Sequence, residues 1–204
     1  MSEITVFTIG HSNHDTEAFV ALLKRHGITA LADVRSAPFS RFHPQFNKDT
    51  LERTLKAEGI RYVFLGKELG ARSQDRSCYE NGRLRYPLLA RTELFKNGIE
   101  RVITGSHDFR IALMCAEKEP LECHRTLLVG RELVELGVDV VHIHADGHLE
   151  AHTDAMQRLL IMVGLPREDL FRTEAELMVE ALSRQEAKVA YADENMNETT
   201  ASAS

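Results

Sequence analysis

Short apolar runs alternate with amphipathic segments along most of the chain. The apolar runs are too short for helices and end at glycine or polar residues, which is typical of buried strands. They cover residues 4–9, 28–34, 61–65, 111–114 and 138–143. Strands that alternate with helices in this way predict an α/β fold: an open, mostly parallel, doubly wound sheet of about five strands with helices on both faces.

The amphipathic segments predict the helices that connect these strands. Each begins near a residue able to cap a helix or ends near a glycine. Residues 66–86 show no period, and residues 61–91 hold seven Lys or Arg against three Asp or Glu. This stretch is either a basic insertion over the site or a solvated loop. The expected helices cover residues 15–27, 48–58, 87–104 with an interruption near Gly98, 123–137, 153–163 and 173–190.

Residues 111–143 form the most informative unit of this pattern. A strand, a loop, a helix and a second strand follow one another within about thirty residues, which is the βαβ unit. Such a crossover joins parallel strands and is nearly always right-handed. The loop after the first strand therefore lies at the carboxyl edge of the sheet, where open parallel sheets bind their ligands.

Length and composition limit the domain organisation. The chain has 204 residues, of which 43% are hydrophobic, so we expect one α/β domain over residues 1–192. Residues 193–204 are small and polar and predict a disordered tail. Three cysteines without framework spacing fit a reducing compartment, and no apolar stretch is long enough to span a membrane. We therefore expect a cytoplasmic protein with no membrane contact.

Reactive side chains follow several of the predicted strands. Because the carboxyl ends of parallel strands meet at one edge, residues that are distant in sequence are expected to form one site. A net charge of −6 argues against a protein that coats nucleic acid, but allows a local basic cleft. The candidate residues are His11, Ser12, Asn13, Asp33, Arg35, Arg41, His43, Cys115, Glu117, Cys123, His124 and Arg125.

Three sequence blocks also carry a resemblance. TIGHSN lies at the first turn, LADVRSAPFSRFHPQF spans the second strand and its loop, and LMCAEKEPLECHR follows in the central unit. Together they resemble the signature blocks of a bacterial and archaeal family, domain of unknown function 488, over most of residues 4–145. The resemblance implies a compact α/β domain with these blocks at the site. It implies no particular reaction.

Four residues are the candidates for catalysis. Cys123 stands at a predicted helix start beside Arg125, and both features lower the pKa of a thiol. Glu117 and Asp33 follow strands and could transfer protons, while His11 could donate to a substrate oxygen. Each has a structural alternative: a buried inert thiol, ion-pair or capping carboxylates, and a hydrogen-bonded core histidine.

The candidates for substrate binding are mostly basic or polar. Arg125 and Arg35 are expected to form an anion site with the unpaired N–H groups of the helix that begins near Cys123. Arg125 could instead pair with Glu117 or Asp33. The other expected binding residues are Arg41, Ser12, Asn13 and His124.

Metal binding is possible at two places, but the spacing at neither matches a standard module. His142 and His144 alternate on one strand, with His148 and His152 beyond them. Cys115, Cys123 and His124 form the second possible ligand set. We assign no metal or other cofactor from the sequence.

Three classes of function fit these residues. The first is an enzyme that acts on an anionic, nucleotide- or nucleic-acid-related substrate at the carboxyl edge of the sheet. The second is a binding module that uses the same pocket without turnover, and the third is a thiol or metal sensor. The chain contains neither GxxxxGK[ST] nor GxGxxG, so the common triphosphate and dinucleotide motifs do not apply.

Overall fold

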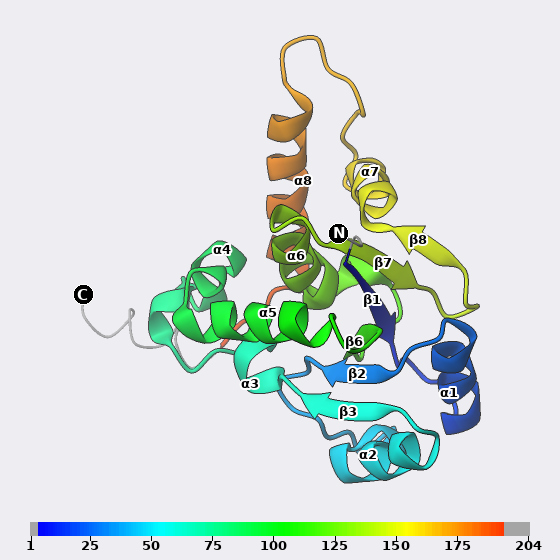
Figure 1. Cartoon of the computed structure of the whole chain (residues 1–204). Helices are drawn as coiled ribbons and strands as arrows, with labels where there is room; N and C mark the ends of the chain where they lie inside the picture. The colour runs from blue at the N-terminus through cyan, green and yellow to red at the C-terminus, as the bar shows by residue number, and fades with distance from the viewer. Residues whose placement is uncertain (1–3, 194–204) are drawn as a thin grey trace.

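A computed structural model describes residues 4–193 and contains a central six-stranded sheet (Figure 1). The strand order is β3-β2-β6-β1-β7-β8. All five predicted strands are present and run parallel: β1 (Thr5–Gly10), β2 (Ala30–Asp33), β3 (Arg61–Phe64), β6 (Ile111–Cys115) and β7 (Asp139–Ile143). The α/β prediction is therefore confirmed.

The sixth strand, β8 (Leu149–Ala151), pairs antiparallel with β7 and was not predicted. It has only three residues and an exposed leucine, so it lacks the apolar run that identifies a buried strand. The turn that precedes it contains Gly147, whose φ of +83° favours glycine. The expected count of about five strands is thus one too low.

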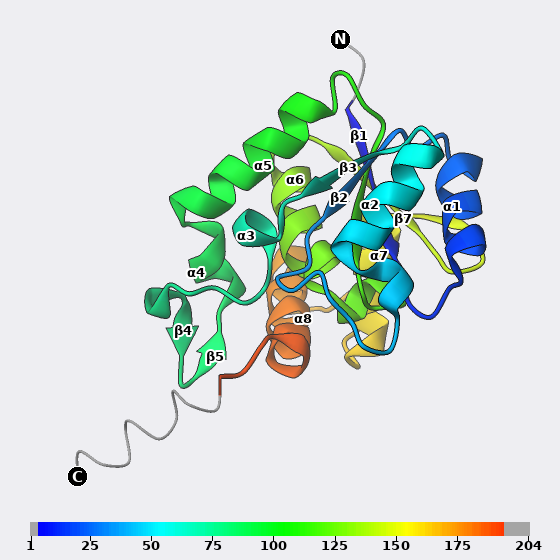
Figure 2. The same ribbon diagram turned by 90° about the horizontal axis from the view of Figure 1, so that it is seen from below.

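Helices cover both faces of the sheet, as expected for a doubly wound fold (Figure 2). The strands are buried on both sides because successive residues point to opposite faces. Phe7 and Ile9 of β1 join the cluster under α1 (Thr16–Arg25) and α2 (Lys48–Ala57), while Val6 joins the cluster on the other face. That second face packs against α5 (Glu93–Gly105), α6 (Arg131–Glu135), α7 (His152–Met162) and α8 (Glu174–Val189).

The predicted helix over residues 87–104 is divided into α4 (Tyr86–Ala90) and α5. The break does not fall at Gly98. It falls before α5, where the Thr92 side chain caps the new helix by accepting from the Phe95 N–H. Gly98 instead allows close packing, because a Cβ there would lie 2.7 Å from Glu68 and Leu69 side-chain atoms of α3 (Gly66–Leu69).

The helix predicted after Cys123 begins with a π-helical segment, Arg125–Gly130, and continues as α6. A short 3-10 turn, Pro120–Glu122, precedes it. Segments of π-helix are uncommon and often occur at functional sites. This one follows directly on the loop that holds most of the candidate reactive residues.

Residues 66–86 fold as more than a loop. They contain α3, a 3-10 turn at Arg76–Cys78, and a hairpin of β4 (Tyr79–Glu80) and β5 (Arg83–Leu84). The end of the described chain closes against this hairpin, since the Leu84 N–H donates to the Tyr191 carbonyl and the Asp193 N–H donates to the Gly82 carbonyl. The predicted disordered tail, apart from Asp193, lies outside the described residues.

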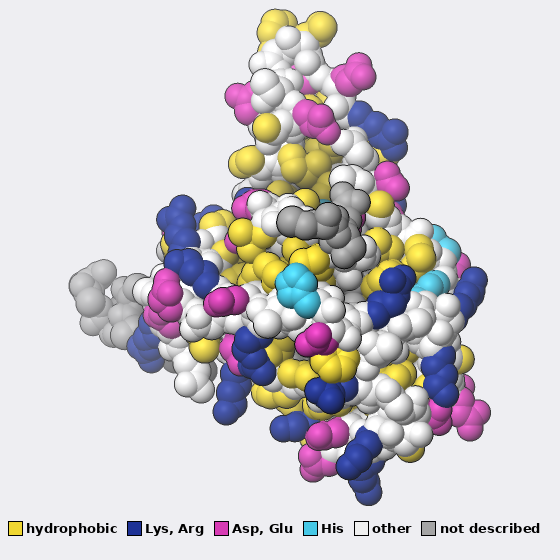
Figure 3. Space-filling view, in the orientation of Figure 1, with side chains coloured by type: hydrophobic (Ala, Val, Ile, Leu, Met, Phe, Trp, Pro, Cys, Tyr) yellow, Lys and Arg dark blue, Asp and Glu magenta, His cyan; other side chains and the backbone are white. Residues whose placement is uncertain are grey.

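Helices α7 and α8 and the loop between them form an arm that projects from the body (Figure 1). Hydrophobic side chains are exposed at its tip (Figure 3), where Leu170 and Phe171 are 95% and 93% exposed. Among residues 4–193, no helix combines the length and apolar character needed to cross a membrane.

Candidate functional site

Two adjoining cavities lie at the carboxyl edge of the sheet. One, of about 240 Å³, is lined by Ser36, Arg72, Tyr86, Cys115, Glu122 and His124 among others. The second, of about 470 Å³, is lined by His11, Ser12, Asn13, Phe39, Ser40 and His43. Both cavities share Arg35, Ala37, Ala116 and Glu117. The loops after β1, β2 and β6 therefore meet at one site, as the topology requires.

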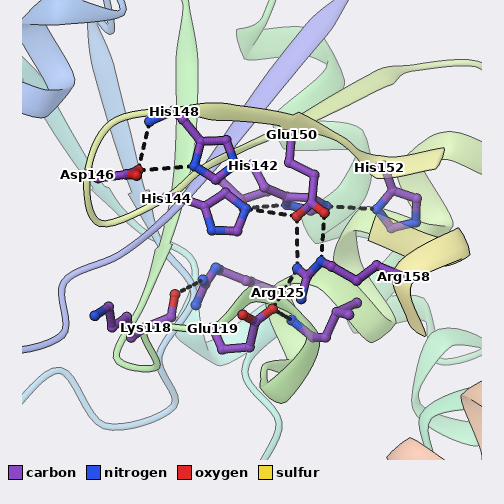
Figure 4. Close-up of polar contacts among 12 residues, drawn as sticks. Lys118, Glu119, Arg125, His142, His144, Asp146, His148, Glu150, His152 and Arg158 are labelled. Atoms are coloured by element: carbon purple, nitrogen blue, oxygen red, sulfur yellow. Dashed lines mark hydrogen bonds and ion pairs between the residues drawn. The ribbon is translucent and has the colours of Figure 1, made fainter. Parts of the chain in front are cut away.

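Arg125 does not line this site, which corrects its predicted role in anion binding. Its side chain is fully buried, and its guanidinium donates to the backbone carbonyl of Glu117 at 2.7 Å. It also donates to the Lys118 carbonyl at 3.3 Å (Figure 4). Within the described part of the chain its Nε has no hydrogen-bond partner. Arg125 thus holds the loop after β6 in place and does not reach a ligand.

Gly10 shows how tightly this loop is held. A Cβ on Gly10 would lie 1.8 Å from the Glu117 carbonyl oxygen and 3.3 Å from Arg125 Nη1. Only glycine permits such a close approach of the loop to the end of β1. The glycine of the TIGHSN block is therefore required by the same contact that Arg125 stabilises.

Asp33 is also structural, which corrects its predicted catalytic role. It is fully buried, and its carboxylate accepts from the Arg35 backbone N–H, from Arg35 Nε at 2.9 Å and Nη2 at 2.6 Å, and from the Tyr62 hydroxyl at 2.8 Å. A carboxylate with this many donors has little capacity left for proton transfer. Partial burial and the negative charge of Asp33 raise the pKa of Tyr62, so its hydroxyl remains a donor.

Arg35 keeps part of its predicted role, because it lines both cavities although it is only 6% exposed. Its Nη2 also donates to the Phe46 carbonyl, and its Nη1 lies 3.2 Å from His11 Nε2. Of its five N–H groups, one on Nη1 has no assigned acceptor among these contacts. Arg35 can therefore offer one further hydrogen bond to a ligand.

His11 is held from both sides, which corrects its predicted role as a donor to substrate. Its Nδ1 donates to the Ser12 carbonyl at 2.9 Å, so Nε2 is the acceptor for Arg35. Burial lowers the pKa of His11 to about 4, and the positive charge of Arg35 adds to this effect. The ring stacks on Phe46 with centroids 4.3 Å apart. His11 is thus a neutral residue that positions Arg35.

Of the remaining predicted binding residues, three line a cavity and one does not. Ser12 and Asn13 line the second cavity, and Ser12 adopts a φ of +48° that turns the chain after β1. His124 lines the first cavity. Arg41 is exposed on the loop after β2 and, among the described contacts, lines neither cavity.

Cys115, Glu117, Cys123 and His124 form a compact cluster, and all of them except Cys123 line the first cavity. Glu117 Oε2 lies 3.0 Å from Cys123 Sγ, and His124 Nδ1 lies 3.7 Å from Cys115 Sγ and 3.9 Å from Cys123 Sγ. His124 Nε2 donates to the Val34 carbonyl at 3.1 Å, which leaves Nδ1 directed at the sulfurs. Cys115, Cys123 and His124 could together hold a metal ion.

The ionisation of these groups is coupled through their contacts. Burial opposes a charge on Cys123, but the Cys115 thiol, Arg125 and His124 outweigh it and lower the pKa of Cys123 well below the ordinary value. The Cys123 sulfur and burial raise the pKa of Cys115 in return. Partial desolvation and the Cys123 charge raise the pKa of Glu117. The thiolate character and the reactivity of Cys123 stay predictions.

The Cys123 thiol is less accessible than a nucleophile must be. Its side chain is 1% exposed, and the residues that line the two cavities do not include it, whereas Glu117 is exposed and lines both. A reactive thiol must combine a low pKa with access. In this cluster, Glu117 is therefore the group best placed to meet a substrate.

The four histidines that the sequence suggested as metal ligands do not converge on one point (Figure 4). His144 Nε2 lies 2.8 Å from Glu150, His148 Nδ1 lies 3.1 Å from Asp146, and His142 Nε2 lies 3.2 Å from His152 Nδ1. These nitrogens face different partners, so the four histidines do not form the common metal site that the sequence suggested. Among residues 4–193, the cysteine cluster is the one group of three such ligands that does converge.

Sequence reasoning did not single out Arg72 or Tyr86, which also line the first cavity. Arg72 belongs to the aperiodic basic stretch, and its guanidinium lies 4.9 Å from the centre of the Tyr191 ring. The local excess of positive charge was the only signal for it. The stretch thus does contribute to the site, through Ala71, Arg72 and Tyr86.

The chain matches the family model described as "Domain of unknown function DUF488" over residues 15–131. No curated protein and no solved structure matches it. The matched segment covers more than half of the chain and includes the loops after β2 and β6 that build the two cavities. The chain therefore belongs to the family of domain of unknown function 488.

Proposed function

We propose that this protein is an enzyme that binds a small anionic substrate, of the size and charge of a nucleotide, and uses Glu117 for proton transfer. The observation that carries the proposal is the position of Glu117. Glu117 lines both cavities, as Arg35 does, and it follows the carboxyl end of β6. A carboxyl group in this place can accept a proton from an attacking oxygen and return it to a leaving group.

The anionic part of the substrate is assigned to Arg35 and Arg72, which both line the first cavity. Arg35 has one N–H left for a ligand, and Arg72 is exposed. The second cavity offers Ser12, Asn13 and the exposed ring of Phe39. Polar groups with an exposed aromatic ring suit a nucleoside, and the two arginines suit a phosphate.

Ligand binding tests the first half of the proposal. Purified protein is screened by thermal shift against nucleotides and phosphorylated sugars, and the compounds are analysed for conversion by mass spectrometry. We expect at least one anionic compound to raise the Tm. Arg72→Ala should reduce that shift, because it removes an exposed cation from the cavity wall.

The matched control is Arg53→Ala on α2, an exposed arginine whose Nε donates to the Asp49 carbonyl. It should bind as well as the wild type. Equal binding by Arg72→Ala and Arg53→Ala would contradict the assignment of the anion site. Glu117→Gln then separates an enzyme from a binding module, since it should keep the Tm shift and lose conversion.

A further inference from the structure

We propose that Cys115, Cys123 and His124 bind a zinc(II) ion at the wall of the first cavity. Their ligand atoms, two Sγ and one Nδ1, lie within 4.8 Å of one another, and all three residues are buried. This inference goes beyond the proposed function, because it concerns an ion that the three side chains would hold with or without a substrate.

The spacing fits tetrahedral coordination. With Zn–S bonds of about 2.3 Å and a Zn–N bond of about 2.0–2.1 Å, a sulfur and a nitrogen on the same ion lie about 3.5 Å apart. The two S···N distances here are 3.7 and 3.9 Å. Only small side-chain adjustments would therefore bring the three atoms to bonding distance of a common centre.

The surroundings already orient the ligands. His124 Nε2 donates to the Val34 carbonyl, which leaves the Nδ1 lone pair facing the sulfurs. The Arg125 backbone N–H donates to Cys123 Sγ at 3.4 Å, as expected for a thiolate ligand. When both cysteines bind as thiolates, their two negative charges balance the charge of a divalent ion.

The ligands also stand on rigid parts of the fold. Cys115 is the last residue of β6, a strand between β1 and β2 in the sheet, and it is in register with Gly10. Cys123 and His124 precede the π-helical segment that Arg125 begins. A site built on such elements is held more precisely than one on a free loop.

Three protein ligands leave a fourth position open, which is the arrangement of catalytic zinc sites. Cys115 and His124 line the first cavity together with Glu117. An ion there would lower the pKa of a bound water, and the Glu117 carboxyl is near enough to the sulfurs to accept its proton. Two thiolates and one imidazole favour zinc over hard cations such as magnesium.

Cobalt(II) titration of the full chain, after treatment with a chelator, tests the site without knowledge of the substrate. We expect one cobalt per chain, with the near-ultraviolet charge-transfer band of thiolate ligands, and displacement by one equivalent of zinc. Cys115→Ser and Cys123→Ser should each weaken cobalt binding by more than about 100-fold. Cys78→Ser is the matched control, because Cys78 is equally buried and lies outside the cluster.

Alkylation of the thiols in the wild-type protein tests the site without requiring that any variant folds. Zinc should protect two of the three thiols, and these should map to Cys115 and Cys123 by mass spectrometry. The inference would be overturned by wild-type protein that shows no thiolate band with cobalt, or by a Cys78→Ser variant that loses as much binding as the cluster variants. Neither result bears on nucleotide binding, so this test and that of the proposed function can fail separately.

Discussion

Replacing Arg125 with Met should destabilise the fold much more than replacing Arg131, a partly exposed arginine at the start of α6. The Arg125 guanidinium is fully buried and donates to the carbonyls of Glu117 and Lys118. Met has a similar length but no donor, so both carbonyls would lose a charged partner. Arg125→Lys should have a smaller effect, because one ammonium group can still reach one carbonyl.

The size of the effect follows from these contacts. A hydrogen bond from a charged donor contributes about 1.5–3 kcal/mol, and Arg125 makes two. Part of this is offset, since removing Arg125 also removes a buried charge whose Nε is unpaired within the described chain. We expect a net loss of about 2–4 kcal/mol. For a chain of this length, that lowers the Tm by about 5–15 °C.

Urea unfolding followed by circular dichroism measures this difference. The control is Arg131→Met, because Arg131 is partly exposed and pairs with Glu135 one turn later. A surface pair of this kind contributes at most about 0.5 kcal/mol. If Arg125→Met were no less stable than Arg131→Met, the structural role of Arg125 would be refuted and its role in anion binding would return.

Two further predictions concern stability. Burial lowers the pKa of His152 to about 4, and burial together with the neighbouring His152 lowers the pKa of His142 well below 6.5. As the pH falls, the unfolded chain therefore binds protons that the folded chain does not bind. The contribution of the two histidines to the free energy of unfolding should be complete above about pH 6.5 and should fall as the pH drops towards 4, by at most about 1.4 kcal/mol per pH unit and histidine. A urea midpoint that rises as the pH drops from 6.5 to 4 would contradict the sign. Gly10→Ala should lower the free energy of unfolding by at least about 2 kcal/mol, because its Cβ would overlap the Glu117 carbonyl. Gly105→Ala should cost much less, because its Cβ would lie 3.2 Å from the Ile111 side chain. Equal urea midpoints for the two variants would show that the loop after β6 can move aside.

The periodic part of the fold was predictable because burial dictates it. Strands between two helical layers are apolar on both faces, so β1, β2, β3, β6 and β7 each left a continuous apolar run in the sequence. Asp15 and Thr173 likewise marked the starts of α1 and α8, where their side chains cap the first turn. The three-residue β8 and the β4–β5 hairpin left no such signal.

The location of the site was predictable for a topological reason, but the roles of its residues were not. Arg125 and Asp33 have the residue types of a substrate site, and residue type alone does not decide between ligand binding and the structural contacts that they make with two carbonyls and with Arg35. Arg35 lies only two residues after Asp33, and Glu117 and Lys118 lie seven or eight residues before Arg125, but only the folded chain shows which of these groups pair. Glu117 and His124 remain at the cavity because no such partner occupies them fully.

The sequence suggested Cys115, Cys123 and His124 as a possible ligand set, but it could not show that their ligand atoms converge. Their spacing matches no standard zinc module, because Cys115 ends a strand while Cys123 and His124 begin a helical segment after an intervening turn. The fold closes that distance through the 3-10 turn at Pro120–Glu122. A spacing rule drawn from small zinc modules cannot describe a site built this way.

The most direct test of the central claim is the rate at which Glu117→Gln converts the compound that the wild type converts. The account predicts that this variant binds the compound with an unchanged Tm shift and converts it about 100- to 10,000-fold more slowly, the range for loss of a general acid or base. Conversion by Glu117→Gln at the wild-type rate would contradict the assignment of proton transfer to Glu117.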